Sequence, residues 1–323
     1  MERWSGLLRV PLHADSRAFY QVAASLSLSP SSNSPIGQMP LSTNAIFFSG
    51  DRVMGIENPV IERFSNLQNI ADIMVSKIGG SVNAWVIEAS LFNGPFAVYN
   101  DFIPSVNQRG EPKSYDPTGF PASRSTVSLL SNCLQEAKSA MAHKHKDPSL
   151  ASISGLQFCR PKTLIFGFSK GGTVVNQLVT ELGFAKSRSC QDRTQTEDEI
   201  QQIIPYMKED FLDSIAEIHY VDVGLNSVGA YITDGYLVEK LSRHLEQVQG
   251  DKGIRFVLHG TPRQWCDTNR SWIRNEKDTL FHLLQSVTQR SGGKLQVCER
   301  FYFADRQPDL QMHFEIIEKL DVS

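Results

Sequence analysis

The stretch Phe166–Gly172, with the sequence FGFSKGG, is the part of the chain that most sharply indicates a fold. Residues 163–166 before it are apolar or β-branched and predict a short buried strand. Residues 173–182 after it carry apolar side chains at helical spacing, and a glycine follows at position 183. A strand, a Gly-x-Ser-x-Gly turn and a helix, in that order, are the setting of a nucleophile elbow.

The turn predicts where the Ser169 hydroxyl lies. In so tight a turn, a side chain at position 167 or 171 would collide with neighbouring backbone, whereas glycine avoids the collision and permits a positive φ. The serine is then presented at the carboxyl end of the strand, where the following helix directs its N–H groups and the positive end of its dipole. We interpret Ser169 as a candidate nucleophile, with simple anion binding at this turn as an alternative.

Strands and helices alternate along the rest of the chain. Segments predicted to be strands lie at residues 45–48, 83–88, 217–221, 254–259 and 296–303, with helical patterns between them. This alternation predicts an α/β fold with a mostly parallel sheet and helices on both faces, and the elbow makes it α/β-hydrolase-like. We expect one domain over residues 41–323, preceded by an amino-terminal segment, residues 1–40, that is partly flexible because residues 25–40 are rich in Ser and Pro.

Composition argues against several classes of function. The 323 residues are 41% hydrophobic and 21% charged, as in ordinary folded globular proteins. A formal net charge of −3 provides no basic field to attract nucleic acid, and no apolar run reaches the roughly 18 residues of a transmembrane helix. Five widely spaced cysteines without a Cys-x-x-Cys pair favour a reducing, intracellular compartment over a disulfide framework or a zinc site.

A serine nucleophile needs a base, and in this fold the order along the chain is serine, acid, histidine. His313 follows the last predicted strand by a short polar loop, which is where the fold places its base. His259, at the carboxyl end of a strand, is the rival. The other downstream histidines lie inside predicted strands or helices and are interpreted as structural or exposed: His219, His244 and His282.

Two aspartates are candidates for the acid that orients the histidine, and each follows a predicted strand. Asp267 lies beyond the penultimate strand, which is the commoner location in this fold, and we favour it. Asp222, directly at the end of an earlier strand, is the alternative. Each also has a structural interpretation, because Asp222 could cap a loop and Asp267 could cap the helix that begins near residue 271.

Acyl transfer also requires N–H donors for an oxyanion. The backbone N–H of Lys170 follows the nucleophile and is one candidate donor. The second is expected from the loop after the strand at 45–48, where Gly50 allows close approach of the backbone. Asp51 would oppose an oxyanion if its carboxylate pointed inward, and an ordinary turn at Gly50 is the competing interpretation.

The sequence indicates neither a cofactor nor a metal. No Gly-x-Gly-x-x-Gly or His-Glu-x-x-His motif is present, and the Walker pattern fails because Lys170 precedes the glycine pair instead of following it. The long segment from Ser90 to Arg124 has little periodicity and follows the carboxyl end of a strand. We interpret it as a pocket wall or lid, with a plain surface loop as the alternative.

Several segments together resemble the eukaryotic family named chromosome 2 open reading frame 69. They occur in the family's order at residues 47–51, 166–171, 220–224, 259–262, 270–272 and 313–314, with an aspartate at 267. The resemblance implies an α/β-hydrolase-like fold, with the serine at Ser169, aspartates at both Asp222 and Asp267, and the histidine at His313. It also implies a mitochondrial location, with the cytoplasm as the alternative.

These observations predict a serine hydrolase that cleaves an ester, thioester or other acyl bond of a small-molecule substrate. Ser169 would attack, His313 would transfer the proton and Asp267, or Asp222, would orient the imidazole. The alternative is a protein of the same fold that has no catalysis and acts in binding or assembly, with a protein partner. The resemblance supplies no substrate for either hypothesis.

Overall fold

The computed structural model describes residues 2–16, 18–28, 43–144, 161–185, 204–205, 207–247 and 253–322. For residues 142–144 it describes the backbone alone. In these ranges, no helix combines the length and apolar character that crossing a bilayer requires.

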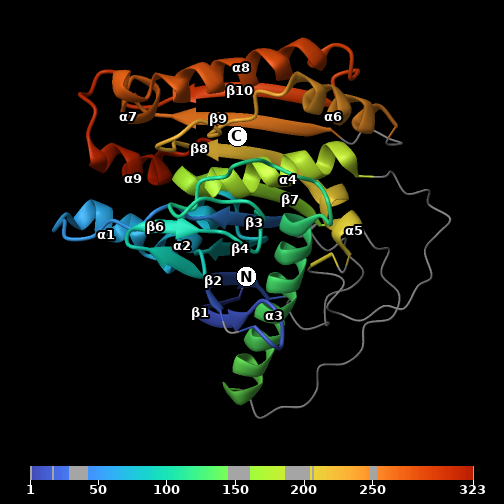
Figure 1. Cartoon of the computed structure of the whole chain (residues 1–323). Coiled ribbons are helices and arrows are strands. Elements are labelled where there is room, and N and C mark those ends of the chain that lie inside the picture. Colours follow the sequence, from blue (N-terminus) through green and yellow to red (C-terminus); the bar gives the residue numbers. More distant parts are fainter. Residues whose placement is uncertain are drawn as a thin grey trace.

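Eight strands form one twisted sheet at the centre of the molecule (Figure 1). β2 pairs antiparallel with both β1 and β4, and the pairs from β4 to β10 are parallel. A separate two-stranded ribbon, β5 (Leu91–Asn93) and β6 (Phe96–Val98), follows β4. In spatial order the sheet strands are β1 (Arg3–Pro11), β2 (Phe19–Ser27), β4 (Val82–Ile87), β3 (Thr43–Phe48), β7 (Lys162–Phe168), β8 (Ile215–Val221), β9 (Ile254–Gly260) and β10 (Leu295–Phe301).

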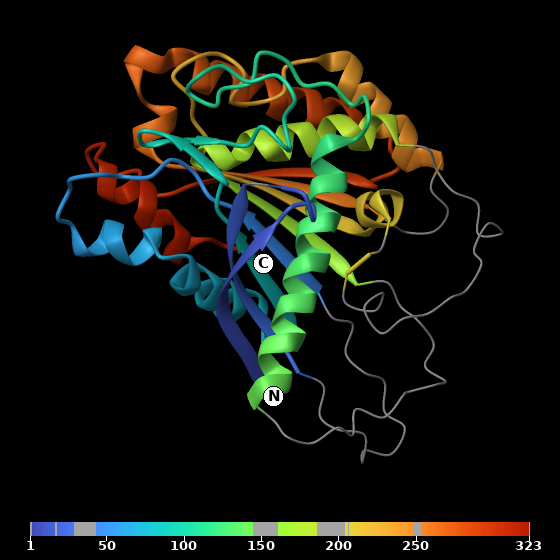
Figure 2. The ribbon, with the colours of Figure 1, turned by 60° about the horizontal axis from the view of Figure 1, so that its bottom comes forward.

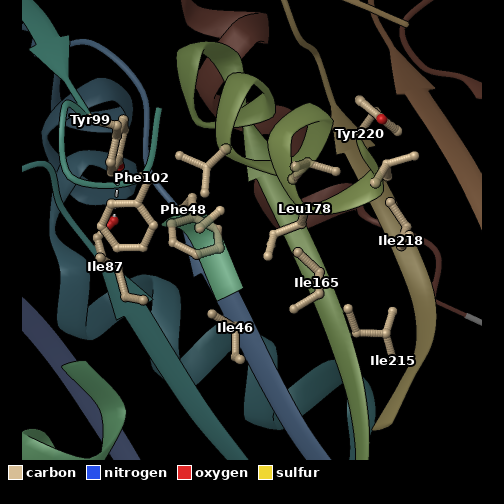
Figure 3. Close-up of a cluster of buried hydrophobic side chains, with 14 of the residues drawn as sticks. Ile46, Phe48, Ile87, Tyr99, Phe102, Ile165, Leu178, Ile215, Ile218 and Tyr220 are labelled. Carbon is tan, nitrogen blue, oxygen red and sulfur yellow. Dashed lines mark hydrogen bonds between the residues drawn. The ribbon is translucent and has the colours of Figure 1, made fainter. Parts of the chain in front are cut away.

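Helices cover both faces because alternate residues of each central strand are apolar on opposite sides. Ile46 and Phe48 of β3 face one layer, shown with Leu178 of α4 in Figure 3, while Ala45 and Phe47 face the other. The first layer contains α3 (Pro121–Lys144), α4 (Gly172–Phe184), α5 (Lys208–Ser214), α6 (Gly235–Gln247) and α8 (Ser271–Thr288). The second contains α1 (Pro59–Ser65), α2 (Leu67–Ile78) and α9 (Leu310–Lys319).

The predicted strands and helices of the central and carboxyl-terminal parts are present within a few residues of the expected bounds. At the amino terminus, the proposed boundary at residue 41 does not hold for the sheet. β1 and β2 lie before it and are paired into the same sheet as β4. The remainder of the segment expected to be flexible, residues 29–40, lies outside the described residues.

The long segment after β4 forms a cover over α4, visible as the teal loop in Figure 2. Buried carboxylates hold it in place. Glu181 of α4 accepts hydrogen bonds from the N–H groups of Ala122 (2.7 Å) and Ser123 (2.8 Å) at the start of α3. Burial raises the pKa of Glu181, although these donors oppose the shift. The segment is therefore packed against α4 and is not a loose surface loop.

A second segment, residues 222–234, is held against this cover in the same way. Glu111 of the cover accepts from the N–H of Asn226 at 2.8 Å, and Glu276 of α8 accepts from the N–H of Gly229 at 2.8 Å. Burial works against ionisation of Glu111, but the hydrogen bonds it receives hold its pKa below the usual value. Loops from three distant parts of the sequence are thus joined beside the carboxyl end of β7.

Candidate active site

The backbone at Ser169 has the conformation that an elbow requires. Ser169 has φ +52°, which is uncommon for a residue other than glycine. A Cβ at Gly171 would lie 2.1 Å from the carbonyl oxygen of Phe48, and one at Gly167 would lie 2.5 Å from a methyl group of Val175. The steric reason predicted for both glycines therefore applies. A 3-10 turn, η1 (Ser169–Gly171), leads directly into α4.

His313 lies in the first turn of α9, which Asp309 caps by accepting from the N–H of Met312 at 2.6 Å. Its ring stacks on Phe168, the residue before Ser169, with 4.6 Å between the ring centroids. The Nδ1 atom is 2.6 Å from Oδ2 of Asp222. Because an ionised carboxylate can only accept, Nδ1 is the donor in this bond and Nε2 is left for another partner.

Asp222 is fully buried at the end of β8, and further donors fix its side chain. Thr261, just after β9, donates its N–H to Oδ1 at 2.7 Å and its hydroxyl to Oδ2 at 3.0 Å. The backbone N–H of Asp222 donates to the carbonyl of His259 at 2.8 Å, and its φ is +45°. These contacts aim the carboxylate at His313 before any ligand is present.

The preference for Asp267 as the partner of the histidine is wrong in this geometry. Asp267 caps the short 3-10 turn η3 (Thr268–Arg270), where it accepts from the N–H of Asn269 at 2.9 Å. Its other oxygen forms an ion pair with Arg270 at 2.8 Å. Asp267 therefore caps the turn that precedes α8 and not α8 itself, whose N-cap is Arg270, and Asp222, the alternative, is the aspartate that contacts His313.

The rival His259 belongs to a different buried network. Its Nε2 lies 3.0 Å from Nδ1 of His219, and its Nδ1 lies 2.9 Å from the hydroxyl of Tyr302. Burial lowers the pKa of both imidazoles, and that of His259 falls well below its usual value. Both ring nitrogens of His259 are thus occupied. His244 and His282 lie within α6 and α8, as the sequence predicted.

Gly50 brings the loop after β3 against the elbow. A Cβ at Gly50 would lie 2.5 Å from the Cβ of Ser169 and 3.0 Å from its Oγ, so only glycine permits this approach. Among the described residues, no carbonyl or side chain accepts the amide N–H of Gly50 or of Asp51. Two backbone donors of this loop are therefore available close to Ser169.

The Asp51 carboxylate is directed to the Lys170 side chain, a contact that the sequence did not reveal. Lys170 Nζ lies 2.9 Å from Oδ1 of Asp51 and donates to the carbonyl of Arg109 at 2.6 Å. The same Asp51 oxygen accepts from the N–H of Ala97 at 2.7 Å. Burial raises the pKa of Asp51 and lowers that of Lys170, while each partner opposes the shift of the other. The ion pair neutralises a carboxylate that would otherwise oppose an oxyanion.

The strand order, the elbow after β7 and a histidine on the helix after the last strand define a protein of the α/β-hydrolase fold. A family model described as C2orf69 matches residues 121–289, just over half of the chain. The chain belongs to the C2orf69 family, as the segments quoted from its sequence predicted.

Known relatives agree with this assignment. The mouse protein named mitochondrial protein C2orf69 homolog is 27% identical over 303 residues, covering 81% of this chain and 72% of the relative. The human mitochondrial protein C2orf69 is 26% identical over 327 residues, covering 87% and 75%. The zebrafish homolog is 26% identical over 237 residues, and the match spans 59% of its length. These names support the mitochondrial location expected from the family resemblance.

Solved structures similar to the chain include a siderophore hydrolase, EstB from Aspergillus nidulans, with a TM-score of 0.45 and 11% identity over 98% of this chain and 92% of that one. The BES protein from Bacillus cereus has a TM-score of 0.44 and 13% identity, with coverage of 98% and 92%. Likenesses this distant add nothing to the chemistry of the site, which follows from its own residues.

Proposed function

We propose that the protein is a serine hydrolase that cleaves an ester, thioester or other acyl bond. The observation that carries this proposal is the hydrogen bond of 2.6 Å between His313 and the buried Asp222, with the histidine ring stacked beside the elbow. A histidine held in this tautomer presents a basic Nε2, which is what a serine nucleophile requires.

In the proposed reaction, the Ser169 Oγ attacks the acyl carbonyl carbon while His313 Nε2 takes the hydroxyl proton. The tetrahedral intermediate then collapses, and the leaving group departs with the proton from His313. Water repeats the sequence on the acyl-enzyme, releasing the acid and restoring the Ser169 hydroxyl. Asp222 stays ionised throughout and stabilises the imidazolium that forms in each half-reaction.

The oxyanion would be bound by backbone N–H groups on two sides of Ser169. Lys170 supplies one at the start of η1, where the first amides of a helix have no intrahelical acceptor. The loop after β3 supplies the other from Gly50 or Asp51. The ion pair between Lys170 and Asp51 joins these two donors into one rigid unit, so little reorganisation accompanies the reaction.

A non-catalytic role in binding or assembly remains the second candidate. The observation that favours it is the low exposure of Ser169, of which only 9% is accessible. Catalysis requires a substrate to reach this hydroxyl, whereas a binding partner would need only the surface around it. In either case we propose that the protein acts in mitochondria, as the names of its relatives indicate.

A fluorophosphonate probe, which phosphonylates activated serines, distinguishes the two functions. Wild type should be labelled, and Ser169→Ala should lose all labelling while keeping its melting temperature. Ser286→Ala is the matched control, because Ser286 is exposed on α8 and bonds only to the carbonyl of Leu283. Labelling that survives in Ser169→Ala, or that is absent from folded wild type, would favour the non-catalytic role.

A further inference from the structure

Arg263 is a charged side chain beside the candidate active site, and no group of the described residues pairs with it. It lies in α7 (Pro262–Trp265), two residues after Thr261, which holds the Asp222 carboxylate. α7 packs against α9, the helix that carries His313, at the carboxyl end of β9 (Figure 1). The side chain is only partly exposed, and within the described ranges its guanidinium has neither a hydrogen bond nor an ion pair.

The acidic groups around Arg263 are already engaged elsewhere. Asp222, Asp267 and Asp309 are near enough to act on its charge. Asp222 accepts from Thr261 and His313, whereas Asp267 pairs with Arg270. Asp309 accepts from the N–H of Met312 and pairs with Arg306 at 3.1 Å.

Three other cations near the elbow, α7 and α9 are paired with carboxylates, in contrast to Arg263. Lys170 contacts Asp51, Arg270 contacts Asp267, and Arg306 contacts both Asp309 and Glu315. Burial lowers the pKa of Arg263, and the positive charge of Arg270 acts in the same direction. A partly buried guanidinium that has no protein partner keeps its N–H donors available for an anionic ligand.

We propose that Arg263 binds an anionic group, a carboxylate or a phosphate, on the substrate that Ser169 attacks. This inference rests on the proposed hydrolase function and narrows its substrate to acyl compounds that carry a negative charge away from the scissile bond. The planar fork of a guanidinium matches both anions through two parallel hydrogen bonds, which a lysine cannot reproduce. Arg263 then acts in orienting the substrate beside His313, and not in the proton transfers.

Binding is tested without reference to catalysis. Isothermal titration of the folded wild type with glutarate, inorganic phosphate and neutral glutaramide, at fixed ionic strength, should show binding of an anion and none of glutaramide. Arg263→Met should weaken that binding at least tenfold, and Arg263→Lys should retain part of it. Arg243→Met on α6 is the matched control, because Arg243 pairs with Glu239 and neither residue acts on the charge of Arg263, and it should bind as wild type does.

The two anions distinguish the two kinds of charged group that the substrate could carry. Preferential binding of glutarate indicates a carboxylate, and preferential binding of phosphate indicates a phosphoryl group. Equal anion binding by wild type and Arg263→Met, or no binding by wild type, would overturn the proposal. Circular dichroism of Arg263→Met and Arg263→Lys establishes that both are folded before these results are compared.

A competition experiment tests whether the anion bound by Arg263 lies next to Ser169. The preferred anion should slow fluorophosphonate labelling of Ser169 in wild type and in Arg243→Met, and this protection should be lost in Arg263→Met. If wild type binds the anion but is never labelled, the hydrolase function fails while the anion site stands. If labelling proceeds and no anion protects Ser169, the hydrolase function stands and the role of Arg263 is refuted.

Discussion

Replacing Asp222 by Asn removes one charge and changes which atoms face His313. Asp222 accepts three hydrogen bonds, two from Thr261 and one from the histidine. An asparagine can retain the bond from the Thr261 N–H, but its NH₂ group then faces His313 Nδ1. The imidazole must accept at Nδ1 and carry its proton on Nε2, where it can no longer take the serine proton.

The expected loss follows from this change of tautomer. A histidine held in the wrong tautomer lowers turnover by about 10⁴-fold, which corresponds to roughly 5.5 kcal/mol of transition-state stabilisation. The second-order rate of fluorophosphonate labelling should fall by a similar factor. Because the volume of the side chain is unchanged, Asp222→Asn should remain folded, although its melting temperature should fall, since one buried donor loses its acceptor.

Asp267→Asn is the matched control, because the same chemical change is made on the neighbouring loop. It removes a partly exposed ion pair with Arg270 and should lower the free energy of unfolding by about 1 kcal/mol. Its labelling rate should equal that of wild type. The role of Asp222 in orienting His313 is refuted if Asp222→Asn is labelled at the wild-type rate, or if Asp267→Asn loses as much activity as Asp222→Asn.

Three further predictions concern the backbone, the buried histidines and the ion pair at the elbow. Gly171→Ala should destabilise the protein by about 1–3 kcal/mol in urea unfolding, since its Cβ has no room, whereas Gly80→Ala, where the space is open, should not. Burial keeps His259 neutral in the folded state, whereas the unfolded state binds a proton. The free energy of unfolding should therefore decline below about pH 6.5, by up to about 1.4 kcal/mol per pH unit. A free energy of unfolding that is constant between pH 7 and 5 would contradict this. Lys170→Met should lower the free energy of unfolding by about 2–3 kcal/mol, which is less than for a fully buried ion pair because Asp51 is 31% exposed. Adding Asp51→Asn should restore part of this loss. A double variant that is less stable than Lys170→Met would argue against the pairing.

Local sequence patterns predict much of this fold. The elbow could be predicted because its strand, glycines and helix are adjacent in the chain, and the position of His313 follows from its place after the last strand. The aspartate could not be chosen in this way, because the contact between Asp222 and His313 spans 91 positions. It depends on donors from Thr261 after a third strand, and no pattern within either aspartate's own loop reports them.

The amino-terminal strands show the same limit. β1 and β2 form an antiparallel pair at the edge of the sheet, and their place depends on pairing with β4, about 60 residues further along the chain. Ser and Pro enrichment just beyond β2 therefore suggested a segment apart from the domain. The ion pair between Lys170 and Asp51 was equally hidden, since the lysine gives no sign in the sequence that its side chain is buried.

The buried carboxylates that hold the cover bear on how a substrate could enter. Glu181 of α4 accepts from the N–H groups of Ala122 and Ser123 at the end of the cover, and Glu111 of the cover accepts from the N–H of Asn226. Lifting the cover would break several of these bonds together, so the free-energy cost would fall on many residues at once. Selectivity for a substrate would then depend on the side chains around Ser169, and a new specificity would arise by changing those side chains without a motion of the cover.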